Sequence, residues 1–412
     1  MIFRRRIYLD YASLTPIDPR VSREMGKFSA GKYANPSSWY REGVAAKKAS
    51  DRSRKIVAEF VHAHPDEIVF TSGGTESNTL AIQGAFDAFM STRSKDISHH
   101  TVNEKPHLVI SSIEHSSIME LAKVLERQGC EVTRVGVDKE GRIDLDELKQ
   151  SLRPSTFLVS VMSVNNEIGT IQPIREIAKV IRNHRKQRQQ MSSPQAAMLD
   201  LSYPLFHTDA AQAALYEELY VEKLGVDLMT LDGSKVYGPR GIGALYVRRG
   251  TPIEPIIHGG GQEMGMRSGT ENLPGIAGFA KALEIAKVEN GKGKMENTEA
   301  LRRMMIVGLQ GMRQDIKVNG PLDDTMRSPH ILNISIPGID NEFFIMQLDA
   351  GGVACSTKSS CLRDEKESYV LQAIGANSQE SVRFSFGRWT TGRDIKRALK
   401  VISGLPNLRN ST

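Results

Sequence analysis

The chain has 412 residues, of which 40% are hydrophobic and 25% are charged, and its formal net charge is +6. This length fits two domains or one large α/β enzyme subunit, and the composition excludes general disorder. Apolar runs stay well below the ~18 residues that span a bilayer, the N-terminus does not resemble a secretory signal, and the three cysteines match no zinc or disulfide pattern.

From these features we expect a cytoplasmic protein without membrane contact and without a metal site. The densest basic stretch is at residues 182–188 (RNHRKQR), which we interpret as the solvated end of a helix. No direct contact with nucleic acid is therefore expected. A site for an acidic partner or for tRNA is the weaker alternative.

Short apolar strands alternate with longer amphipathic helices through the first two thirds of the chain. The strands are predicted at residues 67–71, 107–111, 130–137, 157–163, 205–208, 227–231 and 242–247. The helices are predicted at residues 38–61, 76–89, 117–128, 145–152, 174–184 and 276–288. This alternation predicts an α/β fold with a mostly parallel seven-stranded sheet and helices on both faces. Residues 91–105 and 187–204 are polar and lack periodicity, so we interpret them as surface insertions.

The pattern changes after about residue 265. Helices at residues 299–314, 341–349 and 394–402 alternate there with strands at residues 331–336, 352–355 and 382–386. This is an α+β arrangement, so we predict a second, smaller domain. Residues 16–264 form the large domain, and residues 1–15 and 265–412 form the small one.

Polar and charged residues follow several of the predicted strands, where an open α/β sheet binds its ligands. A glycine-rich helix start at residues 72–78 (SGGTESN) suits a phosphate, Asp209 suits the nitrogen of a pyridinium ring, and Lys235 suits a Schiff base. Each feature alone has a simpler interpretation: a tight turn, a paired carboxylate or a solvated lysine. Together, in this order, they predict the chemistry of pyridoxal phosphate.

Several short motifs carry a resemblance to a known family. They are YLDYASLTP (8–16), NPSS (35–38), FTSGGTESN (70–78), EH (114–115), VNNEIG (164–169), HTDAAQ (207–212), KVYGPRGIG (235–243), HGGGQEMGMRSGTEN (258–272) and VRFSFG (382–387). With these motifs in this order, the chain resembles the cysteine desulfurases, in the class V aminotransferase branch of the fold-type I pyridoxal-phosphate enzymes. The resemblance covers nearly the whole chain, and it implies pyridoxal 5'-phosphate as the cofactor and a small domain that carries the nucleophile.

The resemblance also implies catalytic and substrate-binding roles for individual residues. Lys235 corresponds to the lysine of the Schiff base, Asp209 to the acid at the pyridine nitrogen, and His115 to the imidazole stacked on the ring. Arg383 corresponds to the arginine that binds the substrate carboxylate as a bidentate pair, with Asn166 beside the substrate.

Further residues are implied to bind the cofactor. Gln212 and Asn166 correspond to the groups that hydrogen-bond the ring hydroxyl, and Gly74 and Thr75 correspond to the phosphate-binding helix start. Thr270 corresponds to the residue that reaches the phosphate from a second subunit, so a homodimer is implied.

The nucleophile implied by the resemblance is a cysteine on a loop of the small domain. The register of residues 352–361 (GVACSTKSSC) places Cys361 at that position and Cys355 on an apolar strand. By residue type alone, either cysteine is more often structural. Cys361 is favoured because its neighbours are polar and because Lys358 favours the thiolate. Cys130 is interpreted as a core residue.

The activity implied by the resemblance is removal of sulfur from L-cysteine, which gives L-alanine and a persulfide on Cys361. The sulfur passes to an acceptor or iron–sulfur scaffold protein, for iron–sulfur cluster assembly or tRNA thiolation. Two alternatives stay open. One is a relative that acts on another amino acid, such as a selenocysteine lyase or a transaminase, and the other is a non-catalytic homologue that serves as a binding partner.

The chain departs from the family pattern just before Lys235. Asp232 and Ser234 stand where the family has a serine and a histidine, and the family serine binds the cofactor phosphate. Because an acidic side chain repels a phosphate dianion, Asp232 is expected to weaken cofactor binding. The alternative is that Asp232 caps its own turn and does not face the phosphate.

Overall fold

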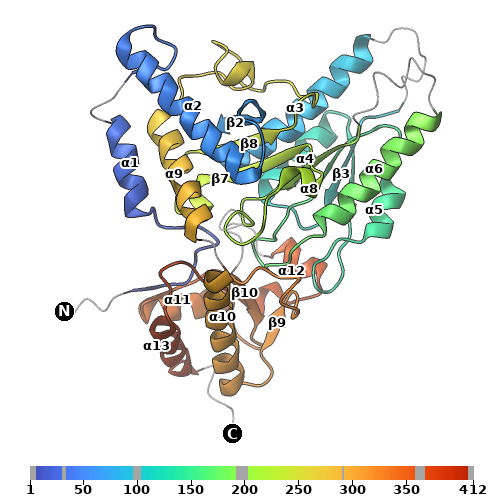
Figure 1. Cartoon of the computed structure of the whole chain (residues 1–412). Coiled ribbons are helices and arrows are strands. Elements are labelled where there is room, and N and C mark those ends of the chain that lie inside the picture. The colour runs from blue at the N-terminus through green and yellow to red at the C-terminus, as the bar shows by residue number, and fades with distance from the viewer. Residues whose placement is uncertain are drawn as a thin grey trace.

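The computed structural model describes residues 6–29, 34–95, 104–191, 203–289, 292–357 and 367–406. Figure 1 shows a larger body built around a central sheet, with a smaller body below it that carries the C-terminal helices and strands. The chain enters the larger body early, and the described residues that follow α9 belong to the smaller body.

The larger body contains a sheet of seven strands among the described residues, in the order β2-β8-β7-β6-β5-β3-β4. The strands are β2 (Ile68–Thr71), β3 (His107–Ser111), β4 (Glu131–Val135), β5 (Thr156–Ser160), β6 (Leu205–Asp209), β7 (Leu228–Asp232) and β8 (Gly243–Val247). Neighbours from β7 to β4 pair in parallel, whereas β8 is antiparallel to both β7 and β2. Apart from the edge strand β4 (EVTRV), which is partly exposed, these strands are buried along nearly their whole length, as expected for strands covered on both faces.

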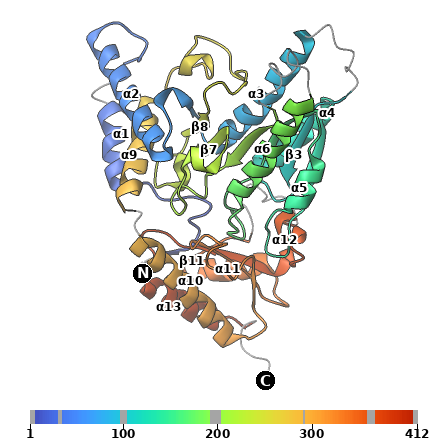
Figure 2. The ribbon, with the colours of Figure 1, turned by 45° about the vertical axis from the view of Figure 1, so that its right-hand side comes forward.

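Helices cover both faces of this sheet (Figure 2). On one face, α3 (Gly74–Lys95) and α4 (Ser116–Arg127) form an apolar cluster with β3 and β5. The cluster on the other face includes α1 (Pro19–Ser29), α2 (Arg41–Val61), α5 (Leu145–Ser151), α6 (Ile174–Met191), α8 (Val221–Leu224) and α9 (Leu273–Glu289). The predicted fold class, a mostly parallel sheet between two helical layers with a smaller α+β part, is therefore confirmed.

Helices α3 and α6 extend beyond their predicted ends. The expected insertions at 91–105 and 187–204 begin inside these helices, so the predicted boundaries are wrong at this point. Arginine, lysine and glutamine favour a helix even where no apolar stripe repeats, so polar composition does not mark a helix end. The basic stretch at 182–188, expected at a solvated helix end, instead lies inside α6, and its Arg185 pairs with the buried Asp227. Residues 96–103 and 192–202 of these insertions lie outside the described residues.

The smaller body has its own apolar cluster. Its helices are α10 (Lys292–Met312), α11 (Asn341–Ala350) and α13 (Gly392–Ser403). Strand β10 (Ile331–Ser335) lies between β9 (Lys317–Asn319) and β12 (Ser381–Ser385) and is antiparallel to both. Strand β1 (Ile7–Tyr8) pairs in parallel with β11 (Val353–Ala354), which supports the proposed assignment of the N-terminal residues to the small domain.

The position of the division between the domains stays a proposal. Helix α9 follows residue 264 but packs against α1 and α2 in the apolar cluster of the larger body. This packing favours a division nearer to the start of α10 than to residue 265. The sequence also leaves α1, β9 and the short α12 (Tyr369–Ala373) unpredicted.

Within the part of the chain that the structure describes, no helix combines the length and the apolar character needed to cross a bilayer.

Candidate active site

A cavity of about 160 Å³ lies at the carboxyl ends of the sheet strands, where the larger body meets the smaller one. Most of the predicted site residues line it together: Gly74, Thr75, His115, Asn166, Asp209, Gln212, Lys235 and Arg383. Two predicted residues are not among them. Thr270 lies elsewhere in the structure, and Cys361 lies outside the described residues.

Lys235 ends a short 3₁₀ turn that follows β7. Its Nζ donates hydrogen bonds to the carbonyl oxygens of Ala12, at 3.1 Å, and Ser13, at 2.6 Å. The segment that carries these carbonyls is tied to the same turn, because the Thr15 hydroxyl donates to the Ser234 carbonyl oxygen at 2.8 Å. A lysine in a turn is usually solvated, whereas this one is half-buried and lines the cavity.

Asp209, the last residue of β6, is a carboxylate that is only 6% exposed. Its Oδ2 accepts a hydrogen bond from Asn78 Nδ2 at 2.8 Å, and its Oδ1 accepts one from the Ala211 amide at 3.0 Å. Both donors are uncharged amides. The negative charge of Asp209 is therefore available to stabilise a cationic ring nitrogen in the cavity.

His115 is connected to Asp209 by hydrogen bonds that the sequence does not predict. The Ser117 amide donates to His115 Nδ1 at 3.2 Å, and the Ser117 hydroxyl lies 2.9 Å from the same nitrogen. This hydroxyl also accepts from Asn78 Nδ2 at 2.9 Å. The available sequence signal for Asn78 is its place one helical turn after Gly74, on the same face of α3.

The neighbouring Glu114 is a second carboxyl group close to Asp209. Its side chain is buried, and its Oε1 accepts a hydrogen bond from the Met162 amide at 2.8 Å. Burial, reinforced by the charge of Asp209, raises the pKa of Glu114 well above its ordinary value. Burial at this position therefore favours the neutral form of the Glu114 carboxyl group.

The start of α3 forms the end of the cavity predicted to bind phosphate. Gly73, just before the helix, has a φ of 146°, which a glycine adopts without strain. Asp232 reaches this helix start: its Oδ2 accepts from the Gly74 amide at 3.3 Å, and its Oδ1 accepts from the Ser234 amide at 2.7 Å. Asp232 thus caps its own turn, as the alternative expects, but it also faces the helix start, so weaker cofactor binding stays a prediction.

Arg383, in the middle of β12, is 1% exposed and lines the cavity from the side of the smaller body. Its Nη2 lies 3.0 Å from Asp10 Oδ1 and donates to the Ser13 hydroxyl at 2.7 Å. Its Nη1 donates to the Asn166 carbonyl oxygen at 2.8 Å, and its Nε is buried without a hydrogen-bond partner among the described residues. The Arg383 guanidinium is therefore already shared with Asp10, and a carboxylate bound beside it would share it too.

The two cysteines within the described residues are poor sources of thiolate. Cys355 follows β11 and packs against the cluster of the smaller body, where burial raises the pKa of its thiol far above the ordinary value. Burial also raises the pKa of Cys130, in the larger body, to about 12. A thiol that stays protonated at neutral pH is a weak nucleophile. These environments support structural roles for both residues.

Thr270 is exposed on the segment that follows β8. Glu263 anchors this segment, because its carboxylate pairs with Arg54 at 2.7 Å and accepts from the Phe70 amide at 2.8 Å. Since Thr270 does not line the cavity of its own chain, its predicted role across a homodimer stays a prediction.

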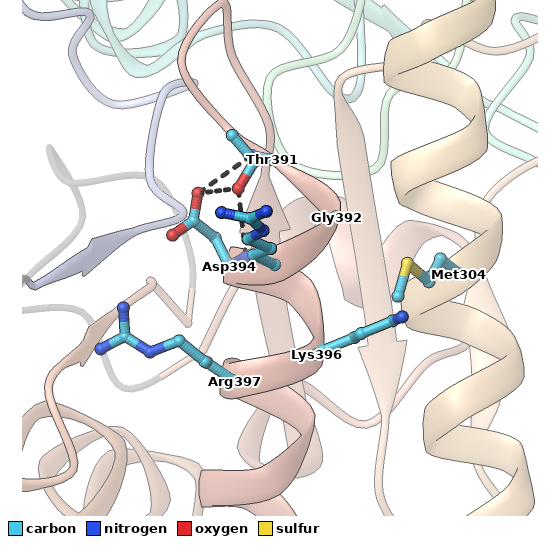
Figure 3. A pocket seen from close by; sticks show the side chains of 7 residues that line it. Met304, Thr391, Gly392, Asp394, Lys396 and Arg397 are labelled. Carbon is cyan, nitrogen blue, oxygen red and sulfur yellow. Dashed lines mark hydrogen bonds between the residues drawn. The ribbon is translucent and has the colours of Figure 1, made fainter.

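A larger hollow, of about 760 Å³, lies at the start of α13 beside α10. Figure 3 shows Met304 of α10 and Lys396 of α13 directed toward each other, and Thr391 joined to Asp394 by the hydrogen bonds of a helix cap. The predicted site residues do not line this hollow. The smaller cavity is therefore the candidate active site.

The chemistry of the smaller cavity fits pyridoxal phosphate. It offers the amine of Lys235, the carboxylate of Asp209 for a ring nitrogen, and the start of α3, at Gly74 and Thr75, for a phosphate. Asp232 is the one feature that fits poorly, because its carboxylate already accepts from the Gly74 amide. The parallel sheet and this set of groups together define a pyridoxal-phosphate enzyme of fold type I.

The family model described as aminotransferase class-V matches residues 7–189 and 195–398, so the chain belongs to this family. Cysteine desulfurase IscS of Dictyoglomus turgidum is 39% identical over 403 residues, which cover 97% of this chain and 94% of that protein. Cysteine desulfurase IscS of Vibrio vulnificus is 40% identical over 405 residues, which cover 96% of this chain and 91% of that protein.

Solved structures agree with these relatives. A NifS-like protein matches with a TM-score of 0.83 and 32% identity, covering 97% of this chain and 98% of that chain. A structure described as SspA in complex with cysteine matches with a TM-score of 0.74 and 31% identity, covering 93% of this chain and 99% of that chain. The comparisons confirm the predicted resemblance, and with it the class of pyridoxal-phosphate-dependent cysteine desulfurases.

Proposed function

We propose that the chain removes sulfur from L-cysteine and yields L-alanine and a persulfide on Cys361. The observation that carries this proposal is the cavity, which unites Lys235, Asp209 and Arg383 from three separate segments of the chain. These residues supply an amine, a carboxylate and a guanidinium, which are the groups needed by a cofactor ring and an amino-acid carboxylate. Relatives named cysteine desulfurase, similar along nearly the full chain, support cysteine as the substrate.

Each residue has a defined part in this reaction. Pyridoxal phosphate, when bound, supplies an electron sink for the bond between the substrate α-carbon and its hydrogen. Asp209 keeps the ring nitrogen protonated, Arg383 binds the substrate carboxylate, and Lys235 Nζ moves the α-proton. The Cys361 thiolate attacks the substrate sulfur, so a sulfur–sulfur bond forms while the carbon–sulfur bond breaks. The electrons of the broken bond stay with the carbon, which takes up a proton to give alanine.

The proposed setting is a cytoplasmic homodimer. Thr270 then reaches the cofactor phosphate of the partner copy, and its exposed position outside its own cavity supports this arrangement. The persulfide sulfur passes to an acceptor protein or to an iron–sulfur scaffold protein. The low cysteine content supports a reducing compartment.

The balance of products tests the proposed reaction. With L-cysteine and a thiol reductant, the purified holoenzyme is expected to release L-alanine and sulfide in equal amounts. A transaminase would release a keto acid instead of alanine, and a selenocysteine lyase would release alanine from selenocysteine while it leaves cysteine unchanged. A non-catalytic homologue would release none of these products. Any of these three outcomes would contradict the proposal.

Removal of the Asp232 charge is expected to tighten cofactor binding. Two like charges about 4 Å apart cost about 4 kcal/mol at an effective dielectric constant of about 20. Solvent screens part of this repulsion because Asp232 is only half-buried, so we expect roughly tenfold tighter binding of pyridoxal phosphate to the Asp232→Ser apoenzyme. Titration of the apoenzyme with the cofactor measures the dissociation constant.

Asp232→Asn is the matched control for this variant. Its amide oxygen still accepts the hydrogen bond from the Ser234 amide, whereas its charge is gone. Similar tightening in both variants identifies the charge as the cause. Unchanged or weaker binding in both variants would show that Asp232 has a structural role alone.

Replacement of Arg383 by lysine is expected to raise the KM for L-cysteine. Lysine keeps the positive charge but does not form a bidentate pair with a carboxylate. Loss of one charge-assisted hydrogen bond, ~1.5–3 kcal/mol, corresponds to a roughly 10- to 100-fold lower kcat/KM. Steady-state kinetics measure this change, and thermal unfolding separates it from the loss of the ion pair with Asp10. A KM for L-cysteine equal to that of the unmodified enzyme would show that Arg383 does not bind the substrate.

A further inference from the structure

A buried histidine of the smaller body contacts the candidate site from outside the cavity. His330 directly precedes β10 and is 3% exposed. Its Nε2 lies 3.1 Å from Gln212 Oε1, and its Nδ1 lies 2.7 Å from the Ser328 hydroxyl. Its ring stacks on Tyr216 of the larger body, with centroids 4.1 Å apart and planes 6° from parallel. The imidazole is therefore held on two sides by hydrogen bonds and on one face by an aromatic ring.

These hydrogen bonds fix the orientation of the Gln212 amide. The Ala12 carbonyl oxygen only accepts, so the Gln212 atom that lies 2.8 Å from it is the nitrogen Nε2. The Gln212 oxygen consequently faces His330, and His330 Nε2 must carry a hydrogen to donate to it. The neutral ring then accepts at Nδ1 from the Ser328 hydroxyl.

The surroundings of His330 keep its ring neutral, as this arrangement requires. Burial, followed by the nearby charge of Arg383, lowers the pKa of His330 to about 3. A protonated ring would offer hydrogens from both nitrogens, and Nδ1 would then no longer accept from Ser328. At neutral pH a single tautomer, with its hydrogen on Nε2, is therefore maintained.

We propose that His330 is a positioning residue that fixes the Gln212 amide so that its N–H, rather than its oxygen, faces the ring hydroxyl of the cofactor. This inference rests on the proposed function, because it needs Gln212 at the ring hydroxyl. Gln212 lines the cavity, and one Nε2 hydrogen is used by Ala12, which leaves the second for the ring oxygen. Without His330 the amide is held by the Ala12 carbonyl oxygen alone, and in an amide that turns despite this contact the oxygen would meet the ring oxygen, which is also an acceptor.

The proposal predicts a shift in the pH titration of the bound cofactor. A donor to the ring oxygen competes with the Schiff-base proton for that oxygen, and therefore lowers the pH at which this proton is lost. His330→Phe keeps a ring against Tyr216 but removes the N–H. We expect this variant to titrate about one pH unit higher, the equivalent of one ordinary hydrogen bond. Absorbance of the holoenzyme as a function of pH measures the midpoint.

Further variants separate positioning from packing. His330→Gln restores an N–H donor near the same place, so its midpoint is expected to match that of the unmodified enzyme. Tyr216→Leu removes the stacked ring but no hydrogen bond of His330, so it is expected to lower thermal stability without moving the midpoint. Ser328→Ala removes the donor to Nδ1, and a smaller upward shift is expected. This variant replaces His330→Phe if the latter does not fold.

In the holoenzyme, two results would support the proposal. The first is a cofactor pH midpoint that rises in His330→Phe and returns to the original value in His330→Gln. The second is a double variant, Gln212→Leu with His330→Phe, whose midpoint shifts no further than that of Gln212→Leu alone. The proposal would be overturned if the midpoints of His330→Phe and Ser328→Ala stay unchanged or if the shifts add up in the double variant. It would also be overturned if Tyr216→Leu shifts the midpoint as much as His330→Phe does. Failure to act on L-cysteine with the midpoint shift intact would contradict the proposed function and leave the role of His330 standing.

Discussion

Replacement of Lys235 by alanine is expected to reduce sulfur release from L-cysteine by roughly a thousandfold or more, because one amine both bonds the cofactor and moves the α-proton. Lys235 Nζ is the amine of the cavity, held by the carbonyl oxygens of Ala12 and Ser13. The residues proposed to hold the phosphate and the ring are unchanged in the variant, so non-covalent cofactor binding is expected to survive. A sulfide assay and the cofactor content of the purified variant measure the two effects.

Lys223→Ala is the matched control, because Lys223 lies on α8, its side chain is 52% exposed, and it does not line the cavity. It is expected to keep full activity. Borohydride reduction of the unmodified holoenzyme, followed by peptide mapping, is expected to label Lys235. Label on any other lysine would show that the assignment is wrong.

Replacement of Cys361 by serine is expected to abolish sulfide release while the spectrum of the bound cofactor stays unchanged. The thiolate that attacks the substrate sulfur is lost, and a serine hydroxyl does not replace it at neutral pH. The register of GVACSTKSSC places Cys361 at the position of the family nucleophile. Mass spectrometry of the peptide that contains this residue is expected to find a persulfide in the unmodified enzyme after one turnover.

Cys355→Ser is the matched control for the nucleophile. The Cys355 thiol is protonated at neutral pH because burial raises its pKa far above the ordinary value, so most of the activity is expected to remain in this variant. If Cys355→Ser instead loses activity and Cys361→Ser retains it, Cys355 is the nucleophile.

Local sequence patterns predict the strands of the large sheet and the residues at their ends. Apolar runs such as LFHT before Asp209 form buried strands, and parallel strands deliver the residues that follow them to one edge of the sheet. For this reason His115, Asp209 and Lys235 are found together in the cavity. The helix ends of α3 and α6 are less predictable, because polar helix formers continue a helix without an apolar stripe.

Contacts between distant segments are the part that the sequence does not predict. Asp10 pairs with Arg383, which is far away in the chain, and His330 reaches Gln212 from the other body. No local period or spacing encodes such pairs, because the packing of the two bodies brings them together. Asp232 shows a related limit. Its hydrogen bond with the Ser234 amide forms a local turn, which is predictable from the neighbouring residues. Its second hydrogen bond, with the Gly74 amide, is not predictable in this way, because Gly74 lies on a helix far away in the chain.

The absorbance spectrum of the purified holoenzyme, recorded before and after addition of L-cysteine, tests the proposed cysteine desulfurase most directly. Pyridoxal phosphate bound to Lys235 gives a visible band, and L-cysteine is expected to bleach it while L-alanine accumulates in the same sample. A holoenzyme whose visible band stays unchanged with L-cysteine, and which forms no L-alanine, would contradict the proposed function.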